Sequence, residues 1–142
     1  GVYQCTDGKW VGVSASSDSV AARVMTVLGV GDDTRFATFS GRTENRDELE
    51  ALMVAWCAQR TRDEVVATLA QADAAVGPVF DMADIATDEH YAARQMIETV
   101  GTTPMQGLLA SLSHTPGVLR WEGRALDADH EDIAKNGWGA TS

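Results

Sequence analysis

The chain contains 142 residues, of which 44% are hydrophobic and 23% are charged, a composition typical of folded globular domains rather than of disordered or collagen-like chains. It carries 21 acidic and 11 basic side chains, and the resulting formal net charge of -10 disfavours binding to nucleic acids and to anionic membrane surfaces. The longest apolar run, residues 51–58, is far too short to cross a bilayer. Two cysteines do not make a disulfide framework in a chain of this length, so we expect reduced thiols and a cytoplasmic protein.

The first part of the chain predicts a β-hairpin followed by a helix. Residues 2–5 and 10–13 have the composition of strands, and Asp7-Gly8 between them supplies the positive φ that a tight turn needs. Residues 14–18 are a small polar loop that ends in good helix-capping residues. Apolar side chains then recur at helical spacing as far as Leu28, after which a glycine ends the predicted helix.

The middle of the chain predicts a helical hairpin. Residues 29–44 have no clear period and are expected to form an irregular connection. Asn45 and Thr61 are each followed three positions later by a glutamate, which is the pattern of an N-terminal capping box. An apolar stripe follows each of them, and only about two residues connect the two predicted helices.

The second half of the chain predicts short elements. Residues 74–79 contain Pro78 and fit an extended buried segment better than a paired central strand. The other expected elements are helices within 81–86 and 88–94, strands at 96–100 and 118–121, and a segment at 102–112 that fits a strand or a helix. The sequence therefore predicts an α+β fold with two to four short, mostly antiparallel strands and three or four helices.

The chemical motifs are incomplete. Gly29-Val30-Gly31 lacks the third glycine and the lysine of phosphate-binding loops, and no Gly-x-Ser-x-Gly motif is present. Residues 127–132 fit a solvated helix start better than a calcium loop. Neither cysteine is accompanied by a base, so we expect packed thiols, and we expect no metal and no bound cofactor. The remaining candidates are three dispersed histidines and three tryptophans that are expected in the core: His90, His114, His130, Trp10, Trp56 and Trp121.

Several short segments follow one another in a recognisable order. They are residues 3–11, 33–38, 45–49, 60–64, 77–79, 88–90, 94–96 and 115–117. In this order and spacing they resemble the C-terminal part of the family III CoA-transferases, the CaiB/BaiF group, which also contains the α-methylacyl-CoA racemases. Residues 123–130 depart from the group, because they lack its late proline and glycine. The chain also begins at Gly1 without a methionine and enters a predicted strand at once, so we expect a fragment of a longer protein.

The resemblance implies a domain organisation and a chemistry. Residues 1–113 would form the small domain of a larger α/β enzyme, and residues 114–142 would return toward its large domain. The family forms interlocked homodimers that act on acyl-CoA thioesters and carboxylic acids. Its catalytic aspartate, which carries the acyl group as a mixed anhydride, lies in the large domain upstream. No residue of this chain matches that aspartate, so the isolated chain is expected to be inactive.

The resemblance also assigns a substrate-facing loop, which consists of Ser14, Ala15, Ser16, Ser17 and Asp18. Small side chains allow such a loop to approach a thioester and to exclude water from a reactive anhydride. The alternative is that these residues only cap the next helix. Three functions remain open, namely CoA transfer, racemisation of 2-methylacyl-CoA and a non-catalytic binding or scaffold role. Residues 73–79 favour a racemase, whereas Ser17 stands where racemases tend to carry a glutamate, so transfer is preferred.

Overall fold

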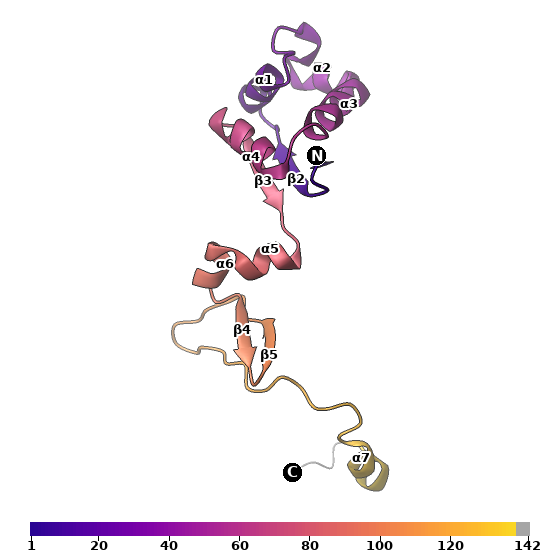
Figure 1. The fold of residues 1–142 in the computed structure, drawn as a ribbon, viewed down its shortest axis with the longest axis vertical. Helices are drawn as coiled ribbons and strands as arrows, with labels where there is room; N and C mark the ends of the chain where they lie inside the picture. Colours follow the sequence, from indigo (N-terminus) through magenta and orange to yellow (C-terminus); the bar gives the residue numbers. More distant parts are fainter. Residues whose placement is uncertain (139–142) are drawn as a thin grey trace. The chain divides into compact units, whose positions relative to one another are not determined.

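The computed structural model describes residues 1–138 and shows the predicted α+β class (Figure 1). Its elements in chain order are β1 (Val2–Gln4), β2 (Trp10–Ser14), α1 (Asp18–Val27), the 3-10 helix η1 (Thr34–Phe36), α2 (Phe39–Glu44), α3 (Arg46–Cys57), α4 (Arg62–Gln71), β3 (Ala75–Val79), α5 (Met82–Thr87), α6 (Glu89–Ala93), β4 (Ile97–Val100), β5 (Thr103–Gln106) and α7 (His130–Asn136). The described residues thus hold seven α-helices, more than the three or four expected. They divide into a first compact unit, Gly1–Asp81, and a second unit that starts at Met82.

The first unit is built on a three-stranded antiparallel sheet with β2 at its centre. Side chains alternate along the strands, so that Tyr3, Val11 and Val13 are buried while Val2 and Trp10 remain exposed on the other face. The β1–β2 hairpin has the predicted turn. Its Gly8 adopts a φ of 77°, and the Asp7 carboxylate accepts a bond from the Lys9 amide at 3.1 Å.

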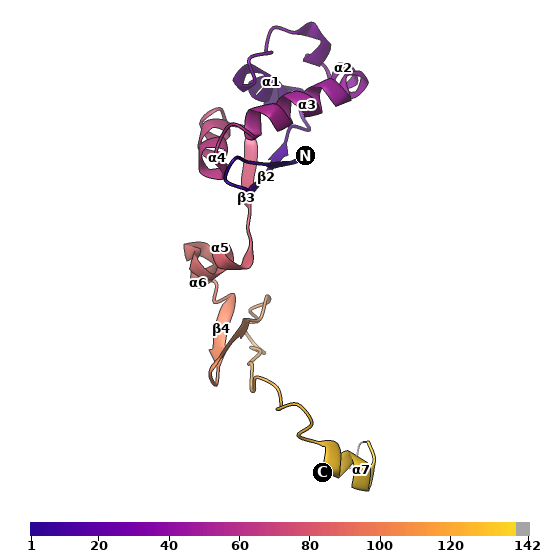
Figure 2. The ribbon, with the colours of Figure 1, turned by 45° about the vertical axis from the view of Figure 1, so that its right-hand side comes forward.

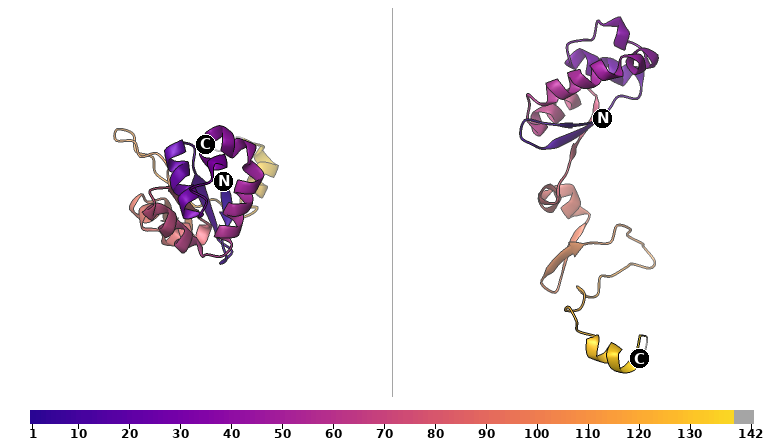
Figure 3. Two further views of the ribbon diagram at one scale, coloured as in Figure 1. Left: turned by 90° about the horizontal axis from the view of Figure 1, so that it is seen from above. Right: turned by 90° about the vertical axis from the view of Figure 1, so that its right-hand side faces the viewer.

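Helices cover the buried face of this sheet. In Figure 2, α4 runs beside β3, and Figure 3 shows the β1–β2 hairpin alongside α3. The helices and the segment before α2 add further side chains to one apolar core, namely Val24, Met25, Phe36, Met53, Cys57, Val65 and Leu69. Burial of each such side chain contributes about 1.5–3 kcal/mol before the entropy cost of ordering it.

The two predicted capping boxes have different outcomes. At Thr61 the box is complete, because Thr61 Oγ1 accepts from the Glu64 amide and the Glu64 carboxylate accepts from the Thr61 amide at 2.8 Å. Asn45 does stand at the N-cap position of α3, but it makes no side-chain cap bond. Its Nδ2 donates instead to the Gly41 carbonyl at 2.8 Å, which gives a hydrogen bond to one of the last carbonyl groups of α2.

Two connections in the first unit are more regular than predicted. The segment 29–44 was expected to be irregular, but it contains η1 and α2, which start from side-chain caps at Asp33 and Thr38. Residues 74–79 were predicted to be extended and buried rather than paired; β3 is extended, but it pairs antiparallel with β2 and none of its residues is fully buried. β3 lies at the edge of the sheet, which is where a strand tolerates a residue such as Pro78 that has no amide proton.

The second unit contains the helices α5 and α6, the antiparallel hairpin β4–β5 and the helix α7. The two short helices and the strand at 97–100 were predicted, and the segment 102–112 resolves into the short strand β5. The predicted strand at 118–121 is absent, and residues 116–125 have no helix or strand.

Among the described residues from Met82 onward only Gly107 is buried, and Trp121 is exposed rather than part of a core. Trp10 is exposed as well. Trp56 is half-buried, and the Arg60 guanidinium carbon lies 4.2 Å from the centroid of its ring.

Candidate functional site

The predicted substrate-facing loop lies between the hairpin and the first helix. The structure shortens its irregular part to residues 15–17, because Ser14 is the last residue of β2 and Asp18 is the first residue of α1. Ser14 is paired with Ala75 of β3, and Ala15 packs against the apolar core. The two flanking elements therefore fix where the loop begins and ends.

The two serines in the irregular part of the loop, Ser16 and Ser17, differ in their contacts. Ser17 is the N-cap of α1, and its Oγ accepts a hydrogen bond from the Val20 amide at 3.3 Å. Ser16 is exposed, and Ala15 beside it turns toward the core. Ser17 therefore caps α1. Ser16 is exposed, so packing against the core does not explain why a small residue stands there.

Arg42 of α2 holds the end of the loop and was missed in the sequence. Its Nη2 donates to Asp18 Oδ1 at 2.7 Å, and its Nη1 donates to the Phe36 carbonyl at 3.2 Å. The Arg42 side chain is only 8% exposed, whereas that of Asp18 is 62% exposed. The capping residue Thr38 was a signal in the sequence for the helix that carries Arg42. No sequence pattern identified Asp18 as the partner of Arg42.

A pocket of about 160 Å³ lies next to the loop. Its wall includes Ala15 of the loop together with Tyr3, Arg42 and Glu50. Burial raises the pKa of Tyr3 far above its usual range, and a hydrogen bond to Glu50 adds to this effect. Tyr3 therefore stays protonated near neutral pH and can donate a hydrogen bond, but it is no candidate for a base.

A second pocket of about 420 Å³ is lined by Ser14, the loop's first residue. Its floor includes Ser14 and the glycines Gly12 and Gly77, which face each other across β2 and β3. Neither glycine has a positive φ, and a Cβ at Gly77 would meet no atom within 4 Å. The two glycines therefore leave open space beside Ser14.

No group near this loop is activated for covalent chemistry. Cys5 and Cys57 are buried free thiols, and burial raises the pKa of both, to about 11 for Cys57. A thiol with a raised pKa is a poor nucleophile at neutral pH. Within residues 1–138, no group of three or more histidine, cysteine, aspartate or glutamate side chains is arranged to hold a metal ion. In the same range, no helix combines the length and the apolar composition that crossing a bilayer requires.

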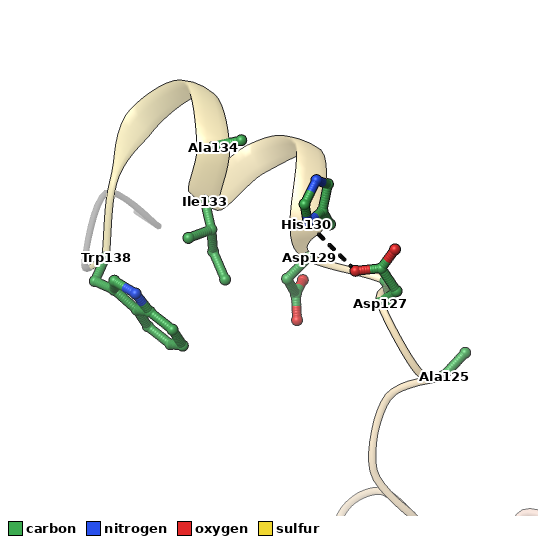
Figure 4. Close-up of a pocket in the computed structure, with 8 residues that line it drawn as sticks. Ala125, Asp127, Asp129, His130, Ile133, Ala134 and Trp138 are labelled. Carbon is green, nitrogen blue, oxygen red and sulfur yellow. Dashed lines mark ion pairs between the residues drawn. The ribbon is translucent and has the colours of Figure 1, made fainter.

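The C-terminal region contains a pocket of about 400 Å³, shown in Figure 4. At one side of it, His130 Nδ1 lies 3.4 Å from Asp127 Oδ1. Ile133 and Trp138 line the other side. The segment 127–132 leads into α7, as predicted for a helix start, and His130 is largely exposed. His90 and His114 are also exposed, and neither lines this pocket. The pocket contains no nucleophile for His130 to activate, and the residues of the predicted loop do not belong to it.

Comparison with known proteins identifies relatives along most of the chain. The family model described as CoA-transferase family III matches residues 1–130. The succinyl-CoA–D-citramalate CoA-transferase of Chloroflexus aurantiacus is 31% identical over 140 residues, which are 93% of this chain and 35% of the relative. The β subunit of the succinyl-CoA–L-malate CoA-transferase of the same organism is 28% identical over 144 residues, which are 95% of this chain and 36% of that subunit.

Solved structures agree with these sequence relatives. A CaiB/BaiF family protein from Brucella suis superposes with a TM-score of 0.76 and 28% identity, over 94% of this chain and 36% of that protein. Rv3272 from Mycobacterium tuberculosis shares the fold, with a TM-score of 0.68 and 21% identity over 83% of this chain and 33% of its own. The chain thus spans 35% and 36% of the length of the two Chloroflexus relatives that it matches.

Proposed function

Because this chain belongs to CoA-transferase family III, we propose that it is the small-domain part of an enzyme that moves coenzyme A between carboxylic acids. The family match over residues 1–130 is the observation that carries this proposal. Two relatives are named for transfer from succinyl-CoA to D-citramalate or L-malate. Succinyl-CoA and small hydroxy dicarboxylic acids are therefore the first substrates to test.

In the proposed reaction, a carboxylate upstream of this chain attacks the thioester carbonyl and coenzyme A leaves as the thiolate. The acyl group is then held as a mixed anhydride, which water would destroy. The role of this chain is to cover that group with the loop that contains Ser16. Its exposed position between two fixed ends supports this assignment, and the pocket lined by Gly12 and Gly77 leaves room beside it.

The proposal extends to assembly. Residues 114–142 would return toward the upstream domain, and the exposure of Val118, Trp121 and Leu126 supports a covering surface for this segment. A homodimer is proposed for the longer enzyme. The α and β subunit names of two relatives support an assembly of more than one chain. Use of CoA thioesters and the presence of two reduced thiols support a cytoplasmic location.

The first experiment compares this chain with the longer enzyme that contains it. Succinyl-CoA is supplied with D-citramalate or L-malate, and formation of the new thioester is followed by chromatography. The longer enzyme is expected to transfer coenzyme A and this chain to show no turnover above buffer, because no residue of the chain supplies the attacking carboxylate. Racemisation of 2-methylacyl-CoA without transfer would favour the racemase alternative, and no reaction with either substrate would favour the scaffold alternative.

The second experiment tests the loop in the longer enzyme. Ser16→Phe is expected to lower kcat about tenfold or more, since a bulky side chain displaces a loop that must close over the acyl group. The KM for the thioester should change little and the melting temperature should stay within about 2 °C, because an exposed loop side chain lacks core contacts. Ser40→Phe, at an exposed serine of α2, is the matched control. An unchanged kcat for Ser16→Phe would assign the loop to helix capping alone.

A further inference from the structure

Arg42 connects the loop to a segment that follows α1 in the chain. One nitrogen of its guanidinium binds Asp18 at the end of the loop, and another binds the Phe36 carbonyl of η1. The Arg42 side chain also forms part of the wall of the pocket beside Ala15. The buried guanidinium of Arg42 therefore contacts Asp18 at one end of the loop, and Arg42 also lines the pocket beside Ala15 near the other end.

The helix that carries Arg42 is itself firmly seated. Thr38 caps α2 through its Oγ1, which accepts from the Gly41 amide at 3.1 Å. Gly41 lies so close to the Arg35 carbonyl that a Cβ at this position would collide with it. Arg35 is in turn paired with Asp33 and Glu48, each at 2.7 Å. The guanidinium of Arg42 thus projects from a support whose position the neighbouring elements determine.

The exposure of Asp18 indicates where this ion pair acts. A pair in which one side chain is largely solvated contributes little to the stability of the whole fold. Asp18 is, however, adjacent to the cap residue Ser17 and two positions from Ser16. Its capture by Arg42 fixes the first residue of α1, where the loop ends, so the main effect of the contact falls on the conformation of the loop.

We propose that Arg42 is a positioning residue that sets the placement of the substrate-facing loop through Asp18. The inference rests on the proposed function, in which this loop covers the acyl group. Loss of the contact widens the range of loop positions, and a misplaced loop slows the reaction much more than it weakens binding of the thioester. Neither Arg42 nor Asp18 takes a chemical step.

The test uses Asp18→Asn, Arg42→Lys and their combination in the longer enzyme that contains this chain. Asparagine removes the charge of Asp18, and a lysine ammonium cannot reproduce the two directions in which the guanidinium donates. Arg23→Lys is the matched control, because Arg23 also donates two hydrogen bonds, but to the Asp73 carbonyl, which is not part of the loop. Hydrogen–deuterium exchange of the peptide covering residues 14–18 measures loop order independently of activity.

Asp18→Asn and Arg42→Lys are expected to speed exchange in this peptide about fivefold or more, and to lower kcat about tenfold. The thioester KM should stay within about threefold and the melting temperature within about 4 °C, and the double variant should be no worse than the more impaired single one. The control should match wild type in exchange and kcat. Exchange that is unchanged, or raised evenly over residues 1–81, would overturn the inference.

The activity measurements separate the inference from the proposed function. If Ser16→Phe lowers kcat while the Asp18 and Arg42 variants do not, the loop covers the substrate and the positioning role is wrong. If none of these variants lowers kcat, the loop does not serve the reaction, and the inference fails together with that assignment.

Discussion

Alkaline pH should destabilise the first unit through Cys57. This thiol lies on α3, has no exposed surface, and burial raises its pKa from 9.0 to about 11. A folded-state pKa above the unfolded one means that the fold gains stability below pH 9 and loses it as the pH rises through about 11. The full difference corresponds to about 3 kcal/mol, and about 2 kcal/mol of it should be lost by about pH 10.5.

The assay is urea unfolding of this chain at pH 8 and pH 10.5 in the presence of a reductant, compared with Cys57→Ala. The substitution leaves a small cavity that costs about 1 kcal/mol at both pH values, and it removes the titrating group. Wild type should therefore lose about 2 kcal/mol more than the variant over this range. Cys5→Ala removes the other buried thiol and serves as the comparison. Equal losses in wild type and Cys57→Ala would exclude Cys57 as the source of the alkaline destabilisation.

Two further predictions concern the stability of α4. Thr61→Ala should cost about 1 kcal/mol, since it removes the cap of the Glu64 amide, and urea unfolding against Thr68→Ala, an exposed site inside the same helix, checks this value. A similar loss in both variants would exclude the capping box as the cause. Leu69→Ala should cost about 3 kcal/mol because Leu69 is fully buried, whereas Leu126→Ala should be nearly neutral because Leu126 is 100% exposed. Calorimetry of both leucine variants measures the contrast, and equal melting temperatures would contradict it.

Local sequence patterns predicted the elements that depend on neighbouring residues. Asp7-Gly8 specified the hairpin turn, and Thr61 with Glu64 specified the start of α4. Both depend on hydrogen bonds across two or three residues, so a short window of sequence contains all the participants. The order of segments also identified the family, which the family match over residues 1–130 confirms.

Local patterns failed where a side chain had two possible partners. The capping pattern at Asn45 was present, but its amide binds the Gly41 carbonyl instead, and Glu48 pairs with Arg35. Because of Pro78, residues 74–79 were predicted to fit an extended buried segment better than a paired central strand. Residues 75–79 instead form the edge strand β3, whose position accommodates that proline. Gly41 lies only four residues before Asn45, but the Arg35 partner of Glu48 and the β2 partner of β3 lie outside any short window around these residues.

The fold class, the hairpin, the second capping box and the family could all be predicted from the amino-acid sequence, because each follows from interactions between near neighbours or from the order of segments. How the loop is held depends on contacts between distant parts of the chain. Asp18 and Arg42 are 24 residues apart, and their contact depends on how α1 and η1, the element before α2, pack into one core through Val24, Met25 and Phe36. Composition and periodicity specify which residues are charged or apolar, whereas the choice of partner for a buried cation requires the positions of all the elements that surround it.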